Sequence, residues 1–90
     1  MKEKMHLKMV TPDGVLWDGE AESVNLKTTM GEITVLPNHI PLIATVEKGL
    51  VRVVSGDSIY TSECDSGVLE VMKGSEVILL ASNASKFLEV

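Results

Sequence analysis

Hydrophobic and polar residues alternate along two early stretches of the chain. In Met5–Met9 and again in Ser23–Lys27, apolar and polar residues follow one another in turn. This period of two is typical of a β-strand that buries one face and exposes the other. Two later stretches, Leu42–Val46 and Leu50–Val54, are more continuously apolar, and the second predicts a strand that is covered on both faces. The pattern therefore predicts β-structure throughout the first half of the chain.

Turn-forming residues separate these runs. The dipeptide Asp18-Gly19 is predicted to end the short run Val15–Trp17, which would place Trp17 at a sheet edge with its indole N–H free for a partner. No helical period occurs before residue 82, and Ser82–Val90 is too short for a stable isolated helix. Eight or nine short strands are expected, in an antiparallel sandwich or a flattened barrel. The remaining strands are predicted at Ile59–Cys64, Val68–Met72 and Val77–Ala81.

The most specific stretch is a loop that contains two prolines. Pro37 and Pro41 fix their own φ angles and remove two backbone donors, so the loop should be stiff. The carboxylate of Glu32, the amide of Asn38 and the imidazole of His39 lie in or near it. A stiff loop with such groups suits the binding of a partner, although the same composition also suits a corner that only joins two strands.

Composition narrows the class of protein. The chain has 90 residues, enough for one domain, and its residues are 44% hydrophobic but only 3% aromatic, so aliphatic side chains must fill the core. The formal net charge is −5 and the cations are dispersed, which argues against a nucleic-acid partner. Cys64 is the single cysteine, so no intrachain disulfide can form. No apolar run approaches the length that spans a membrane.

Candidate catalytic and metal-binding groups are sparse. His6, His39 and Cys64 could supply three metal ligands, but they lie on three separate segments without the usual spacing of a metal site. His6 is expected to be a solvated strand residue on the face opposite Met5 and Leu7. The phosphate-binding glycine motifs are absent, and no catalytic site and no cofactor are expected.

Three segments together resemble one known family. They are Gly31-Glu32 with the run V-L-P-N-H-I-P-L over residues 35–42, K-G-L-V-R-V over residues 48–53, and S-G-V-L-E-V over residues 66–71. This combination is similar to the amino-terminal domain of the epsilon subunit of F-type ATP synthases, which is called delta in mitochondria. The similarity runs from residue 5 to about residue 84. Thr34 and Ile40 depart from it, because the family usually has Gly and Ala there.

The resemblance implies an all-β fold, an antiparallel flattened β-sandwich of about ten short strands. Residues 1–84 would form this domain, and residues 85–90 would be a short tail in place of the carboxy-terminal helical hairpin of typical family members. It also implies a non-catalytic subunit of the central stalk, which docks the gamma subunit onto the c-ring and couples ion translocation to ATP synthesis. Such a subunit would be peripheral on the cytoplasmic face of the bacterial inner membrane and would meet the membrane only through the complex.

Particular positions follow from the same resemblance. Contact with the c-ring is expected for Glu32, Pro37, Asn38 and His39. Candidates for contact with gamma, each also suited to core packing, are Leu42, Leu50, Val54, Leu69 and Val71. The alternative is a free-standing β-sandwich module that binds a small ligand or a metal through His6, His39 and Cys64.

Overall fold

The computed structural model describes residues 3–90, which form ten strands. The described residues contain no helix that is long and apolar enough to cross a membrane. The predicted all-β class is confirmed. The strands are β1 (Met5–Thr11), β2 (Gly14–Ala21), β3 (Ser23–Thr28), β4 (Gly31–Val35), β5 (Leu42–Val46), β6 (Gly49–Ser55), β7 (Ser58–Cys64), β8 (Gly67–Met72), β9 (Glu76–Ala81) and β10 (Leu88–Glu89).

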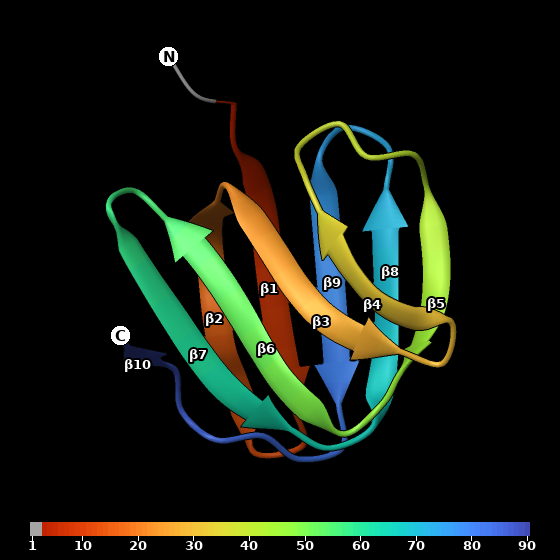
Figure 1. Ribbon diagram of the computed structural model, residues 1–90, viewed down its shortest axis with the longest axis vertical. Helices are drawn as coiled ribbons and strands as arrows, with labels where there is room; N and C mark the ends of the chain where they lie inside the picture. Colours follow the sequence, from red (N-terminus) through yellow and green to blue (C-terminus); the bar gives the residue numbers. More distant parts are fainter. Residues whose placement is uncertain (1–2) are drawn as a thin grey trace.

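All ten strands belong to one sheet that curls back on itself. The strand order is β10-β7-β6-β3-β5-β8-β9-β1-β2, and β4 pairs with β3 beside this path. In Figure 1, β7, β6, β3 and β4 lie in front of β2, β1 and β9, so the two ends of the sheet approach each other. We refer to β5-β8-β9-β1-β2 as the first half of the sheet and to β4-β3-β6-β7 as the second half.

One strand pair differs from the expected antiparallel arrangement. β1 and β9 run parallel, in a register from His6 opposite Glu76 to Val10 opposite Leu80. The expectation of a wholly antiparallel sheet is wrong at this pair, because the first and ninth strands are joined by no hairpin and pair across most of the chain length. The other strand pairs among the described residues are antiparallel.

The core fills the space between the two curled halves. Inward-facing residues alternate with outward ones along most strands, as the period of two predicts: in β1, Met5, Leu7 and Met9 are buried, whereas His6 is exposed. Burying a Leu or Met side chain contributes about 1.5–3 kcal/mol, so the aliphatic cluster supplies most of the stabilisation. Other members of the cluster are Val24, Leu26, Val35, Val46, Val51, Val53, Leu69, Val71, Val77 and Leu79.

The predicted turn at Asp18-Gly19 is wrong, because β2 continues through it to Ala21. Asp18 pairs with Lys8 and Gly19 pairs with Leu7, so strand pairing with β1 overrides the local turn preference of this dipeptide. The register of the β1–β2 pair shifts elsewhere, between Trp17 and Val15, which pair with Met9 and Val10. A β-bulge at that point adds twist and helps the sheet to curl.

The prediction that Trp17 lies at a sheet edge is confirmed, because β2 is the last strand in the order, but the prediction for its indole N–H is wrong. Its indole Nε1 is buried and has no hydrogen-bond partner among the described residues, so it is not available to a partner. The ring packs edge-on against Tyr60 and against Phe87, each with ring centroids 5.2 Å apart. Because Trp17 lies on β2 and Tyr60 on β7, this aromatic cluster closes the curled sheet where its two ends meet.

Residues 82–90 run beside β7, and Phe87 of this segment completes the aromatic cluster. Leu88 and Glu89 pair with Thr61 and Tyr60 of β7, and the backbone N–H of Ser85 donates to the carbonyl of Glu63 at 2.9 Å. The division into a domain of residues 1–84 and a tail of residues 85–90 stays a prediction.

β6 was predicted to be covered on both faces, and this is wrong. Val51 and Val53 are buried, whereas Leu50 and Arg52 on the other face are exposed. Leu50 is 47% exposed, so its apolar character does not reflect full burial within this domain.

Candidate interaction surfaces

The proline loop, residues 36–41, is joined to the turn between β8 and β9. The backbone N–H of Asn38 donates to the Ser75 hydroxyl at 2.9 Å, and that hydroxyl donates to Asn38 Oδ1 at 3.1 Å. Both residues have positive φ, 65° for Asn38 and 60° for Ser75. Asn tolerates this conformation better than most residues, and the reciprocal hydrogen bonds help to offset its cost. Two hydrogen bonds therefore hold the proline loop against the β8–β9 turn.

Further contacts order the same loop. The backbone N–H of His39 donates to the carbonyl of Leu36 at 3.1 Å, which closes a tight turn over Pro37 and Asn38. The side-chain amide of Asn38 also contacts the carboxylate of Glu3. The predicted stiffness of the loop thus has a structural cause beyond its prolines. Two large apolar side chains of the loop stand in solvent, Leu36 at 55% exposed and Ile40 at 75% exposed.

The four residues expected to contact the c-ring are not gathered at one point. Pro37, Asn38 and His39 lie together in the loop, whereas Glu32 lies at the beginning of β4, beside the turn from β3 and opposite Lys27. The two positions are therefore at opposite ends of β4 (Figure 1). Glu32 is exposed, so its carboxylate is free of the core.

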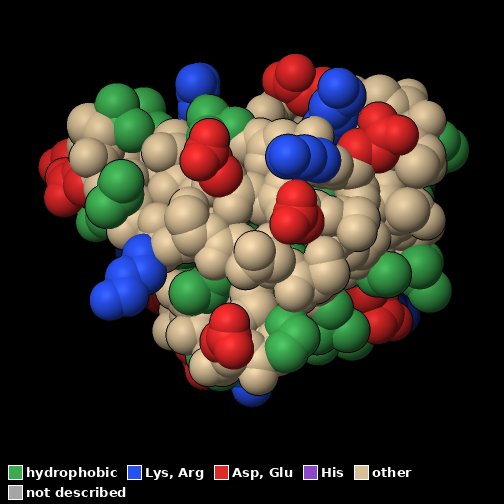
Figure 2. Space-filling model, turned by 90° about the horizontal axis from the view of Figure 1, so that it is seen from below, with side chains coloured by type: hydrophobic (Ala, Val, Ile, Leu, Met, Phe, Trp, Pro, Cys, Tyr) green, Lys and Arg blue, Asp and Glu red, His purple; other side chains and the backbone are tan. Residues whose placement is uncertain are grey.

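The end of the molecule away from the proline loop has a mixed surface. Figure 2 shows acidic and basic side chains interspersed there, with the hydrophobic side chains in several separate groups. A surface of this kind has no strong field of one sign that would attract a highly charged partner.

The five candidates for contact with gamma fall into three groups. Leu69 and Val71 are buried, at 0% and 3% exposed, and their side chains point into the core. Their assignment to a partner surface is therefore corrected, because inward positions of β8 have no surface to offer. Leu42 is partly buried against the core, whereas Leu50 and Val54 lie on the outer face of β6.

Reasoning from the sequence missed a row of apolar residues on the outer face of the sheet. Outward-facing residues of four adjacent strands are paired in one line across the first half of the sheet: Val68 with Leu80, Leu80 with Val10, and Val10 with Val15. We call these four residues the apolar row. Val15, Val68 and Leu80 are 53%, 44% and 52% exposed. The sequence signal for this row was an apolar residue at an outward position in each strand. It could not be told apart from the inward-facing apolar residues of the same strands.

The residues of the alternative ligand or metal site are not brought together. His6 faces solvent on β1, His39 lies in the proline loop, and Cys64 is buried at the end of β7. Burial raises the pKa of the Cys64 thiol, which disfavours the thiolate that metals and electrophiles require. The described residues contain no group of three His, Cys, Asp or Glu side chains that could hold a metal ion.

Solved structures share this fold. A chain of the cryo-EM structure of the Euglena gracilis mitochondrial ATP synthase, OSCP/F1/c-ring, superposes with a TM-score of 0.86 at 18% identity, over 91% of this chain and 52% of that one. A chain of the Tetrahymena thermophila mitochondrial ATP synthase central stalk and c-ring superposes with a TM-score of 0.76 at 14% identity, over 94% and 68%. At these identities the likeness shows the fold alone.

Sequence comparison goes further. The ATP synthase epsilon chain of Halalkalibacterium halodurans is 38% identical over 80 residues, which are 89% of this chain and 59% of that protein. The chloroplastic epsilon chain of Bigelowiella natans is 46% identical over 55 residues, 61% of this chain and 40% of that protein. This chain thus spans less than two thirds of the length of these relatives. The family model for the beta-sandwich domain of the ATP synthase delta/epsilon chain matches residues 4–87, so the chain belongs to this family.

Proposed function

We propose that this protein is a non-catalytic subunit of the central stalk of an F-type ATP synthase, which docks gamma onto the c-ring and couples ion translocation to ATP synthesis. The single observation that supports this most directly is the apolar row, an exposed hydrophobic surface on a domain of the delta/epsilon family. Contiguous apolar surface of this kind marks interaction sites on soluble proteins.

The apolar row is the proposed gamma-facing surface. Covering side chains that are already half buried contributes about 1 kcal/mol for each Val or Leu, which is enough for a few such contacts to dominate an interface. The row crosses four paired strands, so its side chains are fixed relative to one another before binding. Leu50 and Val54 on β6 remain predicted gamma contacts, and the binding experiment described below tests them as well.

The proline loop is the proposed contact with the c-ring, through Pro37, Asn38 and His39, with Glu32 at a second point. The support for this is the attachment of the loop to Ser75 by hydrogen bonds, together with the exposed side chain of Ile40 within the loop. A rigid contact transmits force without losing binding energy to the ordering of a flexible segment.

The same proposal includes the sandwich architecture of the domain and its location in the cell. The two curled halves act as the layers of a flattened sandwich. The protein would be associated with the membrane as part of the ATP synthase complex, on the cytoplasmic face of the bacterial inner membrane, and no cofactor takes part in its role.

Binding to gamma tests the proposal. The chain is titrated with the gamma subunit from the same organism in a calorimeter, and co-elution is followed by size-exclusion chromatography. Leu80→Asp should weaken binding at least about tenfold, because it places a charge in the middle of the apolar row. Circular dichroism and thermal melting confirm that the variant is folded.

Leu50→Asp is the matched control. Leu50 and Leu80 are both outward-facing strand leucines, 47% and 52% exposed, and they lie on different halves of the sheet. Loss of binding in Leu50→Asp with retention in Leu80→Asp would move the gamma-facing surface to β6. A wild-type chain that does not bind gamma at all would overturn the stalk function itself.

A further inference from the structure

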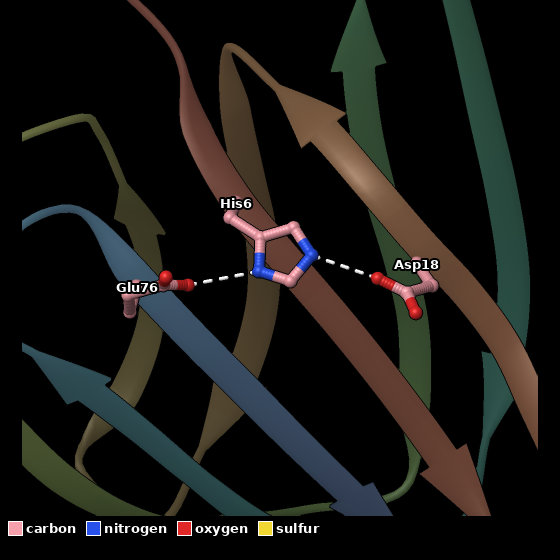
Figure 3. Close-up of polar contacts among 3 residues, drawn as sticks. All are labelled: His6, Asp18 and Glu76. Atoms are coloured by element: carbon pink, nitrogen blue, oxygen red, sulfur yellow. Dashed lines mark hydrogen bonds and ion pairs between the residues drawn. The ribbon is translucent and has the colours of Figure 1, made fainter.

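His6 contacts two carboxylates from two neighbouring strands. Its Nδ1 lies 2.8 Å from Oε2 of Glu76 on β9, and its Nε2 lies 2.7 Å from Oδ1 of Asp18 on β2 (Figure 3). Both contacts are hydrogen bonds only if each ring nitrogen carries a proton, since an ionised carboxylate can only accept. The geometry therefore corresponds to a charged imidazolium held between two carboxylates.

The three residues lie at the parallel β1–β9 pair and the neighbouring β1–β2 pair. His6 is paired with Glu76 at the beginning of the parallel β1–β9 ladder, which attaches the β1–β2 hairpin to β9. Parallel pairs are slightly less stable per residue than antiparallel pairs. The imidazolium bridges this ladder on one side and the β1–β2 pair on the other, so it reinforces both attachments of β1.

The charged groups around His6 come from all three strands. Asp18 and Glu20 lie on β2, Glu76 on β9, and Lys8 follows two residues later on β1. Lys4, just before β1, forms an ion pair with Glu20, with Nζ 3.6 Å from Oε1. The hydrogen bond to Asp18 and then that to Glu76 raise the pKa of His6 above its ordinary value. Acidic groups thus outnumber cations close to the ring and favour its charged form.

We propose that His6 is a proton-dependent clasp, which strengthens the attachment of the β1–β2 hairpin to β9 while its ring is charged and weakens that attachment when the ring is neutral. A neutral imidazole has one N–H and can satisfy only one of the two carboxylates, so Asp18 or Glu76 loses its partner. The clasp is a property of the isolated domain and does not depend on the proposed stalk function.

The same residue links the clasp to the proline loop. The backbone N–H of His6 donates to the carbonyl of Ser75 at 2.9 Å, and the Ser75 side chain holds Asn38. Release of the clasp therefore loosens the strand whose first residues support this turn. The loop would become less ordered at high pH through these hydrogen bonds, with no change in its own residues.

The pH dependence has a definite sign. Because the pKa of His6 is higher in the folded chain than in the unfolded chain, the stabilisation is complete below the unfolded-state pKa. It is lost as the pH rises through the folded-state pKa. The site is half exposed, so solvent screens the effect and keeps it small.

The test combines a titration with a melting experiment on the 90-residue chain. Nuclear magnetic resonance follows the imidazole signals, and the His6→Gln variant assigns them; the His6 signal should titrate above the usual range for histidine. Between about pH 6 and about pH 9 the wild-type Tm should fall by about 2–5 °C more than that of His6→Gln. Asp18→Asn should shift the His6 titration to lower pH.

His39→Gln is the matched control and should keep the pH dependence of the wild type. Two results would overturn the clasp: a His6 signal that titrates in the usual range, or a pH dependence of Tm that is the same in wild type and in His6→Gln. Backbone amide exchange in β1 separates the clasp from a general pH effect, since only the wild type should lose protection as the ring becomes neutral.

Discussion

The outer faces of the two halves of the sheet differ along their middle rows. Across the first half, Val68, Leu80, Val10 and Val15 form the apolar row. Across the second half, register pairs join Thr34, Asn25, Arg52 and Thr61 in a row that is entirely polar. Both rows cross four strands of the same sheet and both face away from the core. Outward-facing apolar residues are therefore not required by this fold.

The polar row also lies beside a hollow in the surface. It borders a hollow of about 460 Å³, and the side-chain amide of Asn25 donates to the Thr34 hydroxyl at 2.9 Å across β3 and β4. Water satisfies such a surface at no cost, whereas the apolar row gains free energy only when it is covered. The comparison therefore favours the apolar row over the polar row as the proposed gamma-facing surface. The hollow is lined by Ser23, Asn25, Lys27, Glu32, Thr34, Gly49, Leu50 and Arg52.

The largest expected effect separates inward from outward leucines. Leu69→Ala on the inner face of β8 should lower the free energy of unfolding by about 2–5 kcal/mol, because it leaves a cavity in the core. Leu50→Ala on the outer face of β6 should change it by less than about 1 kcal/mol. Urea denaturation measures both. Equal losses in the two variants would contradict the distinction between a core face and an outer face.

A second effect concerns how closely the strands pack. A Cβ atom added at Gly67, the first residue of β8, would lie 2.2 Å from the carbonyl oxygen of Leu80, so backbone must move. Gly67→Ala should cost about 1–3 kcal/mol. At Gly49, the first residue of β6, the nearest atom is Lys27 Cβ at 3.6 Å, an ordinary contact, and Gly49→Ala should be close to neutral.

Thermal melting of the two alanine variants compares these positions directly. A larger loss of Tm in Gly49→Ala than in Gly67→Ala would contradict this prediction. It would mean that the backbone of Leu80 can move away from Gly67 at little cost.

The smallest expected effect on stability is at the edge of the polar half. Glu32→Lys should change the free energy of unfolding by less than about 0.5 kcal/mol, because its side chain is exposed. In ATP synthase that carries the variant, ion pumping driven by ATP should weaken if Glu32 meets the c-ring. Glu63→Lys, an exposed carboxylate on β7, is the control and should leave pumping unchanged. Undiminished pumping in Glu32→Lys would remove Glu32 from the proposed contact.

Much of the fold could be predicted because its signals are local. The alternation in Met5–Met9 predicted both the strand and the exposure of His6, and both are confirmed. The turn at Asp18-Gly19 was wrong because the preference of two residues was weaker than their pairing with β1. The proline loop was predicted from Pro37 and Pro41, but its attachment to Ser75 was not, since that residue lies in a distant turn.

The surfaces could be predicted less well than the strands. Leu69 and Val71 were interpreted as candidates for a partner surface, and both are in the core. Val10 and Leu80 were not singled out, although they belong to the apolar row. A single sequence gives the alternation within a strand, but it does not say which of two apolar faces is covered when both carry aliphatic residues.

Backbone preferences and short motifs were enough to predict the all-β class, the approximate positions of most strands, the proline loop and the membership of a family. They were not enough to predict that β1 runs parallel to β9, that the apolar row is continuous, or that His6 lies between Asp18 and Glu76. The physical reason is that strand periodicity is fixed by the geometry of neighbouring residues, whereas strand order and register depend on pairing between residues far apart in the chain.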